Sequence, residues 1–469
     1  MVVGEFTQET DLVVIGGGPA GYSAAFQAAE LDVQTVLIDE RDALGGVCLH
    51  EGCVPSKTLL SIAESINTAK RAEAFGVHFK PPEIDIEQIQ KWTKNSIDNL
   101  SRGLDQLCKK HGVERIQGRA SFADSRNLAV AESDVPRIRF RRALICTGSR
   151  HVSHPALSTD LPGVLTPNEA VRPTWVPRTL LVIGNNYQAL EIACIYDALG
   201  SAVTVIDEHE RFLMDADPDI ARPLLRVLND RLDAMKPGVQ VESAEQKDNQ
   251  LTLTYFGKEP PKQTTFDAVV LATEQVANVE SLHLDATKVQ QDERGFITVN
   301  GQFKTDDPRI YAVGDVIGGQ LLADKAIHQG RAAAQFIAGY GGEFDVRAVP
   351  MAVFTDPNVA WCGLTEAQAK AEKRDFQVKK IPWGASGRAV GMGRSDGLTK
   401  VIYDASSELV LGVGIVGAHA AEMISEAALA IEMGAVLTDI AETIHPHPTT
   451  SELLSEVALQ ASNDGVNSS

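Results

Sequence analysis

The stretch DLVVIGGGPAGYSAAFQAAELDVQTVLIDE, residues 11–40, decides the fold of this chain. It begins with an apolar run, passes through three glycines, continues as an alanine-rich segment and ends in a second apolar run that closes on Asp39. This order predicts a strand, a tight turn, a helix and a second strand. The stretch RTLLVIGNNYQALEIACIYDALGSAVTVIDE, residues 178–208, repeats the plan. In both stretches 23 residues separate the first glycine of the turn from the closing aspartate, so we expect two βαβ units.

The glycines of the first turn have the spacing Gly16-x-Gly18-x-x-Gly21. In a βαβ unit the first glycine makes the turn, the second lets a pyrophosphate approach the backbone, and the third lets the helix pack closely on the strand. Asp39 ends the second strand, where a carboxylate accepts hydrogen bonds from a ribose. We predict a nucleotide bound at this unit. The alternative is a glycine-rich strand–helix turn without a ligand.

The whole chain, at 469 residues, is long enough for about three domains. Residues 84–110 are typical of a mostly polar helix, and residues 113–145 alternate like an antiparallel meander that ends in a buried strand at 143–148. Five prolines between 150 and 177 mark one domain boundary, and a second lies near 341–350. Beyond it, residues 350–460 combine strands and helices into a third unit.

The composition, with 44% apolar and 23% charged residues, is typical of a soluble globular protein. The net charge of −20 disfavours nucleic acid and anionic membranes as partners, because their phosphates would be repelled. Residues 12–29 carry no charge, but acidic flanks and the glycine turn argue against a membrane span or a signal peptide. We therefore expect a cytoplasmic protein.

Cys48 and Cys53 in GGVCLHEGCVPSK, residues 45–57, are the one closely spaced pair among six cysteines. An ideal helix would place positions i and i+5 roughly 8.7 Å apart and rotated by about 140°, beyond the ~7 Å that a disulfide spans. A bridge therefore requires a distorted segment at the start of a helix, where nearby glycines supply the freedom. The four remaining cysteines stand among apolar residues and are expected to be buried: Cys108, Cys146, Cys194 and Cys362.

The chemistry of the pair favours a redox-active disulfide. A small closed ring is readily reduced, and a thiolate near a helix N-terminus or near Lys57 has a lowered pKa. Two buried free thiols are the alternative. A zinc site would need about two more soft ligands, and only His50 is close in sequence, so we predict no metal.

The glycine turn, the cysteine segment, TDDPRIYAVGD (305–315) and HPHPTTSE (445–452) together resemble the flavin-dependent pyridine nucleotide-disulfide oxidoreductases. The resemblance covers nearly the whole chain and is strongest to members that oxidise dihydrolipoamide. It implies an α/β fold with two Rossmann-like dinucleotide-binding domains and an α+β C-terminal dimerisation domain. The implied bounds are 1–152 and 279–346 for the FAD domain, 153–278 for the NAD-binding-like domain and 347–469 for the interface domain.

The resemblance also implies a role for each matching residue. Cys53 would face the flavin and Cys48 would exchange with the substrate. Lys57, paired with Glu191, would lie beside the flavin. His447, oriented by Glu452, would be the base that reaches the disulfide of the other subunit in a homodimer. The residues implied to bind FAD are Gly16, Gly18, Gly21, Asp39, Gly46, Lys57, Ala120, Gly148, Asp315, Leu322 and Ala323.

The second unit, which would bind NAD, departs from the family at two positions. The residues that would bind NAD are Gly184, Glu191, Asp207 and Glu274. Asn186 occupies the second glycine position, where a side chain meets the pyrophosphate, and Glu274 places a carboxylate where the family has a glycine. Asp207, followed by Glu208 and Glu210, favours NAD over NADP.

Three functions follow from these observations. The first is FAD-dependent oxidation of dihydrolipoamide on a lipoyl-domain protein, of a 2-oxo acid dehydrogenase complex, glycine cleavage or another pathway, with NAD⁺ as acceptor. The second keeps the flavin and the disulfide but exchanges electrons with another acceptor or donor. The third is a non-catalytic flavoprotein that binds a lipoyl-protein complex.

Overall fold

The first βαβ unit forms as the sequence predicts, with β1 (Thr7–Ile15), α1 (Pro19–Glu30) and β2 (Thr35–Asp39). The computed structural model describes residues 7–248, 250–257 and 262–467. β1 and β2 pair in parallel, and residues 12–14 of β1 are fully buried because helices cover one face of the sheet and the strands within residues 119–145, with residues 277–297, cover the other. The second unit repeats the arrangement with β9 (Thr179–Ile183), α6 (Tyr187–Leu199) and β10 (Ala202–Asp207), so the internal repeat is confirmed.

The first sheet carries the order β3-β2-β1-β6-β5-β4, and β17 also pairs with β6. Its further elements are α2 (Gly46–Glu51), α3 (Cys53–Ala72), α4 (Ile86–His111), β3 (Glu114–Gln117), β4 (Arg119–Asp124), β5 (Asn127–Ala131), β6 (Arg137–Ile145), β17 (Ile310–Ala312) and α8 (Ala323–Ile337). The helix predicted over 84–110 is confirmed as α4.

The meander predicted over 113–145 is only partly correct. β4, β5 and β6 are antiparallel, but β3 pairs in parallel with β2. The reason is connectivity: α2, α3 and α4 form a crossover between β2 and β3, and a helical crossover returns the chain in the parallel direction. The buried strand predicted over 143–148 ends at Ile145, after which the chain leaves the sheet.

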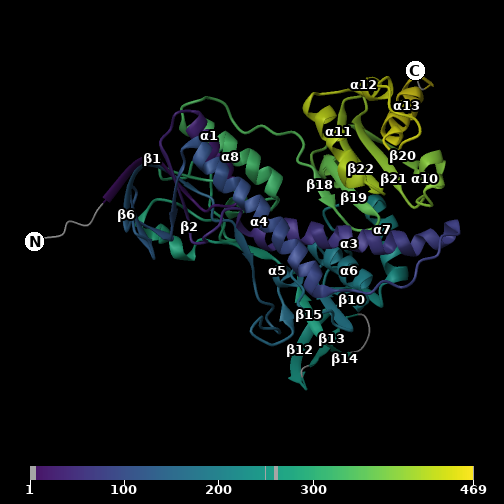
Figure 1. Cartoon of the computed structure of the whole chain (residues 1–469). Coiled ribbons are helices and arrows are strands. Elements are labelled where there is room, and N and C mark those ends of the chain that lie inside the picture. Colours follow the sequence, from purple (N-terminus) through teal and green to yellow (C-terminus); the bar gives the residue numbers. More distant parts are fainter. Residues whose placement is uncertain (1–6, 249, 258–261, 468–469) are drawn as a thin grey trace, which may run out of the picture.

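The second sheet is wholly parallel, in the order β11-β10-β9-β15-β8, and a three-stranded antiparallel sheet, β12-β13-β14, lies beside it (Figure 1). In the two-stranded antiparallel ladder β16-β7, the segment that enters this region pairs with the segment that leaves it. The further elements are β7 (Ser149–His151), β8 (Val164–Leu165), α5 (Pro167–Ala170), α7 (Pro218–Arg231), β11 (Ala234–Pro237), β12 (Gln240–Lys247), β13 (Gln250–Phe256), β14 (Lys262–Phe266), β15 (Ala268–Leu271) and β16 (Gln275–Ala277).

The C-terminal part is an antiparallel sheet, β18-β19-β22-β21-β20, covered by helices and drawn in yellow-green in Figure 1. It contains β18 (Met351–Val353), β19 (Asn358–Gly363), α9 (Glu366–Ala371), β20 (Phe376–Pro382), α10 (Gly387–Gly391), β21 (Leu398–Asp404), β22 (Val410–Gly417), α11 (Ala420–Glu432), α12 (Leu437–Ala441) and α13 (Glu452–Asn467). Short 3₁₀ turns lie at 73–75, 280–282, 284–286, 314–317 and 383–385. The α/β fold with a C-terminal α+β unit is as predicted.

The predicted division into an FAD domain, an NAD-binding-like domain and an interface domain remains a prediction, and its outermost bounds, 1 and 469, lie outside the described residues. No helix in the described part of the chain is long and apolar enough to cross a membrane.

Candidate active site

A cavity of about 810 Å³ lies where the first glycine turn, the cysteine segment and the start of α6 meet. The carboxyl ends of parallel strands β1 and β2 open onto it, which is where open α/β sheets bind ligands. Most residues implied by the resemblance line it: Gly16, Gly18, Asp39, Gly46, Cys48, Cys53, Lys57, Ala120, Gly148, Glu191, Asp315, Leu322 and Ala323. Gly21 instead packs against the backbone of Gly16, the role predicted for the third glycine.

The first glycine turn presents bare backbone to the cavity. Gly16 has φ +106°, and a Cβ there would lie 2.4 Å from the Cys146 carbonyl oxygen; one on Gly46 would lie 2.7 Å from the Gly18 Cα. Gly18, the residue before α1, lines the cavity and provides no side-chain cap, so no side chain pairs with the first amides of the helix there. Asp39 accepts hydrogen bonds from the Gly17 and Arg41 amides at 2.5 and 2.7 Å. This cradle fits the pyrophosphate and ribose of FAD.

The far end of the cavity is bordered by Asp315 and the N-terminus of α8. Asp315 follows β17, and its Oδ2 accepts a hydrogen bond from the Ser149 hydroxyl at 2.8 Å. Burial raises the pKa of the Asp315 carboxyl, although the Ser149 hydrogen bond opposes the shift. Asp324, at the first turn of α8, also lines the cavity.

The cysteine pair lies on two short helical segments rather than on one. α2 carries Cys48 and ends at Glu51, and α3 begins at Cys53. Gly52 separates them with φ −130° and ψ −98°, so the helix is interrupted between the cysteines as the bridging argument required. Both cysteines are free thiols here and are half-buried. The other four cysteines are buried, as predicted.

The two thiols have opposite pKa shifts. The Cys48 thiol shares a hydrogen bond with Cys53, and this bond together with burial raises the pKa of Cys48. The same bond lowers the pKa of Cys53; burial opposes the shift, and the Lys57 ammonium adds to it. Cys53 therefore loses its proton more readily than Cys48, which favours the implied roles of Cys53 as the charge-bearing thiol and Cys48 as the exchanging thiol.

Lys57 lies one turn after Cys53 on α3 and forms an ion pair with Glu191 of α6. The distances from Lys57 Nζ to the Glu191 carboxylate oxygens are 3.0 and 2.7 Å. Glu191 is 2% exposed and also accepts the Phe354 amide at 2.9 Å. The ammonium lies 4.6 Å from the centre of the Phe354 ring. This pair fixes a positive charge beside the cysteines.

His447 and Glu452 form a hydrogen-bonded pair at the surface of the C-terminal part, away from this cavity. The distance from His447 Nδ1 to Glu452 Oε1 is 2.6 Å, and Glu452 also accepts the Thr449 amide. The hydrogen bonds from the Thr449 amide and from the His447 imidazole lower the pKa of the Glu452 carboxyl. The His447 side chain is 81% exposed, and neither residue lines the cavity of its own chain. Its implied action on another subunit's cysteines remains a proposal.

Gly184, Asp207 and Glu274 do not line the cavity either. Gly184 and Asp207 lie in the second βαβ unit, and Glu274 is exposed before β16. Of the residues implied to bind NAD, only Glu191 faces the cavity.

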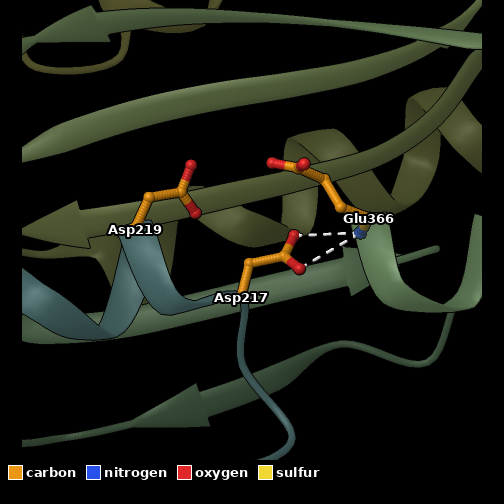
Figure 2. A group of neighbouring side chains, drawn as sticks. All are labelled: Asp217, Asp219 and Glu366. Carbon is orange, nitrogen blue, oxygen red and sulfur yellow. Dashed lines mark hydrogen bonds between the residues drawn. The ribbon is translucent and has the colours of Figure 1, made fainter.

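A separate cluster of carboxylates connects the second sheet to the C-terminal part (Figure 2). Asp217 precedes α7, Asp219 lies in its first turn and Glu366 begins α9. The Lys400 ammonium is within 2.7, 3.0 and 2.7 Å of these three carboxylates, and Lys380 lies within 3.5 Å of Glu366. The lysines hold the position that a cation would take, so the cluster is an ion-pair network between two parts of the molecule.

Sequence reasoning did not single out Ser149, Phe354 or Tyr187, which all line the cavity. Tyr187 follows the second turn directly, so its place at the start of α6 was the available signal. Ser149 and Phe354 reach the site through tertiary packing, and no local pattern marks them.

A bare dinucleotide cradle that opens onto a polarised cysteine pair defines a flavin-dependent disulfide oxidoreductase. Comparison with known proteins agrees. Residues 10–330 match the pyridine nucleotide-disulphide oxidoreductase family, and residues 349–458 match the dimerisation domain of that family. The chain belongs to this family.

Relatives with curated names are called dihydrolipoyl dehydrogenase. The protein of Buchnera aphidicola is 41% identical over 94% of both chains, and that of Haemophilus influenzae is 38% identical over 95% of this chain and 93% of its own. Among solved structures, LpdA from Mycobacterium tuberculosis has a TM-score of 0.89 at 26% identity, covering 96% of this chain and 99% of its own. The flavoprotein disulfide reductase RclA from Escherichia coli has a TM-score of 0.85 at 25% identity, covering 96% and 99%.

Proposed function

We propose that the protein oxidises protein-bound dihydrolipoamide to lipoamide through Cys48 and Cys53, with FAD as cofactor and NAD⁺ as acceptor. The observation that carries the proposal is the polarised cysteine pair at the edge of a dinucleotide cavity. The family uses FAD and NAD(H), and the relatives' name describes this reaction. The glycine turn and Asp39 would hold FAD, which would supply the two-electron transfer between the cysteine pair and NAD⁺.

The residues of this chain would perform the dithiol half of the reaction. A substrate thiolate attacks the Cys48 sulfur of the oxidised pair, and the disulfide bond breaks with Cys53 as the leaving thiolate. The second substrate thiol then displaces Cys48 and closes the lipoamide disulfide. The substrate loses two electrons and two protons: the cysteines gain the two electrons, one proton ends on the Cys48 thiol, and the other leaves to the base, so that Cys53 stays a thiolate. The lowered pKa of Cys53 suits a leaving group, and the Lys57 ammonium stabilises the negative charge of its thiolate.

The proton acceptor of this exchange would be His447, which Glu452 holds at Nδ1 so that Nε2 is free to take a proton. Because His447 is exposed and does not line its own chain's cavity, we propose that it serves the cysteines of a second subunit. The dimerisation domain supports a homodimer. A lipoyl-domain protein as substrate carrier and a cytoplasmic location complete the proposal.

Anaerobic titration of the FAD-loaded protein with dihydrolipoamide tests this function. We expect one equivalent of dithiol to reduce the pair and to produce the long-wavelength absorbance of a thiolate beside a flavin. Cys48→Ser should retain FAD and lose dithiol turnover, whereas Cys108→Ala, at a buried thiol outside the cavity, should retain both. A wild-type protein that dihydrolipoamide does not reduce would contradict the proposal.

A second candidate keeps the dithiol half and gives the electrons to another acceptor. The second glycine turn favours it, because the Asn186 side chain already accepts the Ala189 amide at the start of α6. Stopped-flow reduction with NADH at millimolar concentration separates the two, because only the first candidate requires that NADH reduce the flavin.

A further inference from the structure

The two dinucleotide turns of this chain have the same backbone. The Gly16 amide donates to the Ile38 carbonyl at 2.8 Å, and the Gly184 amide donates to the Ile206 carbonyl at 3.0 Å. Both glycines have φ above +100°, and a Cβ on either would lie within 2.4 Å of a carbonyl oxygen on the neighbouring strand end. The residues that begin the two helices also match: Gly18 has φ −75° and ψ −173°, and Asn186 has φ −85° and ψ 176°.

The side chains at these two positions distinguish the turns. α1 begins without a side-chain cap, which leaves its N-terminal amides to a ligand. In the second turn Asn186 Oδ1 accepts the Ala189 amide at 3.0 Å, and Asn186 Nδ2 donates to the Ala272 carbonyl at 3.0 Å. Asn186 therefore occupies the helix N-terminus that would otherwise receive a phosphate, and its amide is anchored to the end of β15.

The carboxylates that end the second strand of each unit, Asp39 and Asp207, are both held by the chain. In the first unit, Asp39 is held by the backbone amides of Gly17 and Arg41. In the second unit, Asn185 Nδ2 donates to Asp207 Oδ1 at 3.0 Å, and His209 contacts the same oxygen through its amide and its ring. Because both oxygens of Asp39 are engaged and, within the described residues, only one oxygen of Asp207 is, the carboxylates do not set the second unit apart, and the difference between the units lies at Asn186.

The surroundings of the second turn are also acidic. Glu208 follows Asp207 at the surface, and Glu274 is exposed two residues after Ala272, the residue to which Asn186 is anchored. An anionic pyrophosphate that entered here would find the Ala189 amide already bonded to Asn186, and it would be repelled by the carboxylates of Glu208 and Glu274. Both effects weaken coenzyme binding.

We infer that Asn186 is a specificity-determining residue that limits the affinity of the second unit for NAD⁺. Its side chain competes with the coenzyme pyrophosphate for the N-terminus of α6. The inference rests on the proposed function, in which NAD⁺ is the acceptor, and predicts an enzyme whose dithiol half is intact and whose coenzyme half operates only at high NAD⁺ concentration.

The test measures the Kd for NAD⁺ by calorimetry on the FAD-loaded protein. Asn186→Gly should lower the Kd by about tenfold or more, the change expected from one regained charge-assisted hydrogen bond. Asn186→Ser retains a capping oxygen and should leave the Kd close to the wild-type value. Asp85→Gly removes a comparable cap from α4, where Asp85 accepts the Gln88 amide, and should also leave it unchanged.

Two results would overturn the inference: a wild-type Kd below about 10 µM, near the tight end of ordinary KM values, or an Asn186→Gly protein that binds NAD⁺ no more tightly than wild type. The first needs no variant and therefore holds even if the glycine variant folds poorly. Reduction by dihydrolipoamide is followed in parallel. Its absence in the wild type would contradict the proposed function, whereas normal reduction with an unchanged Kd in Asn186→Gly would contradict only the role of Asn186.

Discussion

Lys57 is the residue that connects the cysteine chemistry to the packing of the molecule. Its ammonium lowers the pKa of Cys53 and at the same time neutralises Glu191, which is 2% exposed. Cys53 therefore has a depressed pKa in the folded protein, and its thiolate persists below the ordinary thiol pKa of 9.0. The stability that this thiolate contributes is present above the unfolded pKa and is lost as the pH falls through the folded one.

Lys57→Met should shift the thiolate titration of Cys53 to higher pH, because the nearby positive charge is gone. It should also reduce the free energy of unfolding by about 3 kcal/mol, since Glu191 is left without its charged partner. The pH dependence of long-wavelength absorbance in the dithiol-reduced protein measures the first effect, and urea denaturation measures the second. The double variant Lys57→Met/Glu191→Gln should regain stability, but its Cys53 thiolate should still form at a higher pH than in the wild type. A Cys53 titration that stays at the wild-type pH in both variants would show that Lys57 does not act on the thiol.

At the scale of elements, the glycine turn and its helix determine whether a βαβ unit can receive a nucleotide. The first and second units share strand pairing, turn geometry and helix start, and they differ chiefly in the side chains at the turn. A cap that stabilises a helix N-terminus by about 1 kcal/mol also removes the amide on which a phosphate depends.

Gly18→Asn should give α1 of the first unit the side-chain cap that Asn186 gives α6. The nearest atom to a Cβ at Gly18 is the Gly46 Cα at 3.8 Å, so the backbone accommodates a side chain there. We expect the variant to fold, with α1 gaining a cap, and to bind FAD about tenfold more weakly or worse. Flavin content after gel filtration and the Kd for added FAD measure the effect. Unchanged FAD retention would mean that the α1 amides do not contribute to cofactor binding.

The elements that the sequence predicted well are those with strong local patterns. The two βαβ units, the long helix α4 and the strands and helices of 350–460 carry clear periodicity and turn signals. The pairing of β3 with β2 was missed because strand partners depend on connectivity, which alternation alone does not encode. In the site, the cysteines, the glycines and Lys57 stand in recognisable motifs. Ser149 and Phe354 reach the cavity from distant parts of the chain, and the Asn186 cap required coordinates to identify.

At the scale of the whole molecule, Lys400 joins the second sheet to the C-terminal part. Its side chain is 1% exposed and contacts Asp217, Asp219 and Glu366. Burial lowers the pKa of the Lys400 ammonium, but the hydrogen bonds that it donates to the three carboxylates outweigh burial, and the net shift is upward. For Asp219 and Glu366 burial raises the pKa, and the contacts with Lys380 and Lys400 turn the net shift downward.

Lys400→Met should reduce the free energy of unfolding by about 3–5 kcal/mol, because three carboxylates would face one another without their buried cation. The exposed Lys370→Met, at a helix-surface pair with Glu366, should cost less than about 1 kcal/mol. For the wild type, the depressed carboxyl pKa values mean that the stabilisation is fully present above the ordinary values of 3.8 and 4.5 and is lost as the pH falls through the lower values of the folded protein. Urea denaturation at pH 7 and at about pH 2.5 measures both effects. Equal losses in the two lysine variants would show that the buried network adds no stability.

The proposed catalytic unit extends over two subunits, and mixed dimers provide its sharpest test. His447→Gln alone should slow dithiol turnover by roughly 10²–10⁴, as expected for a lost general base, and Cys48→Ser alone should abolish it. If His447 of one subunit acts on the cysteines of the other, a dimer formed from one chain of each variant retains one intact site. Random re-association of equal amounts would then restore about a quarter of the wild-type activity, because half of the dimers are mixed and each has one of two sites. If both residues acted within one chain, every site in the mixture would lack one of them. Activity that stays at the level of the separate variants, in dimers shown to have exchanged subunits, would place His447 outside the partner's site.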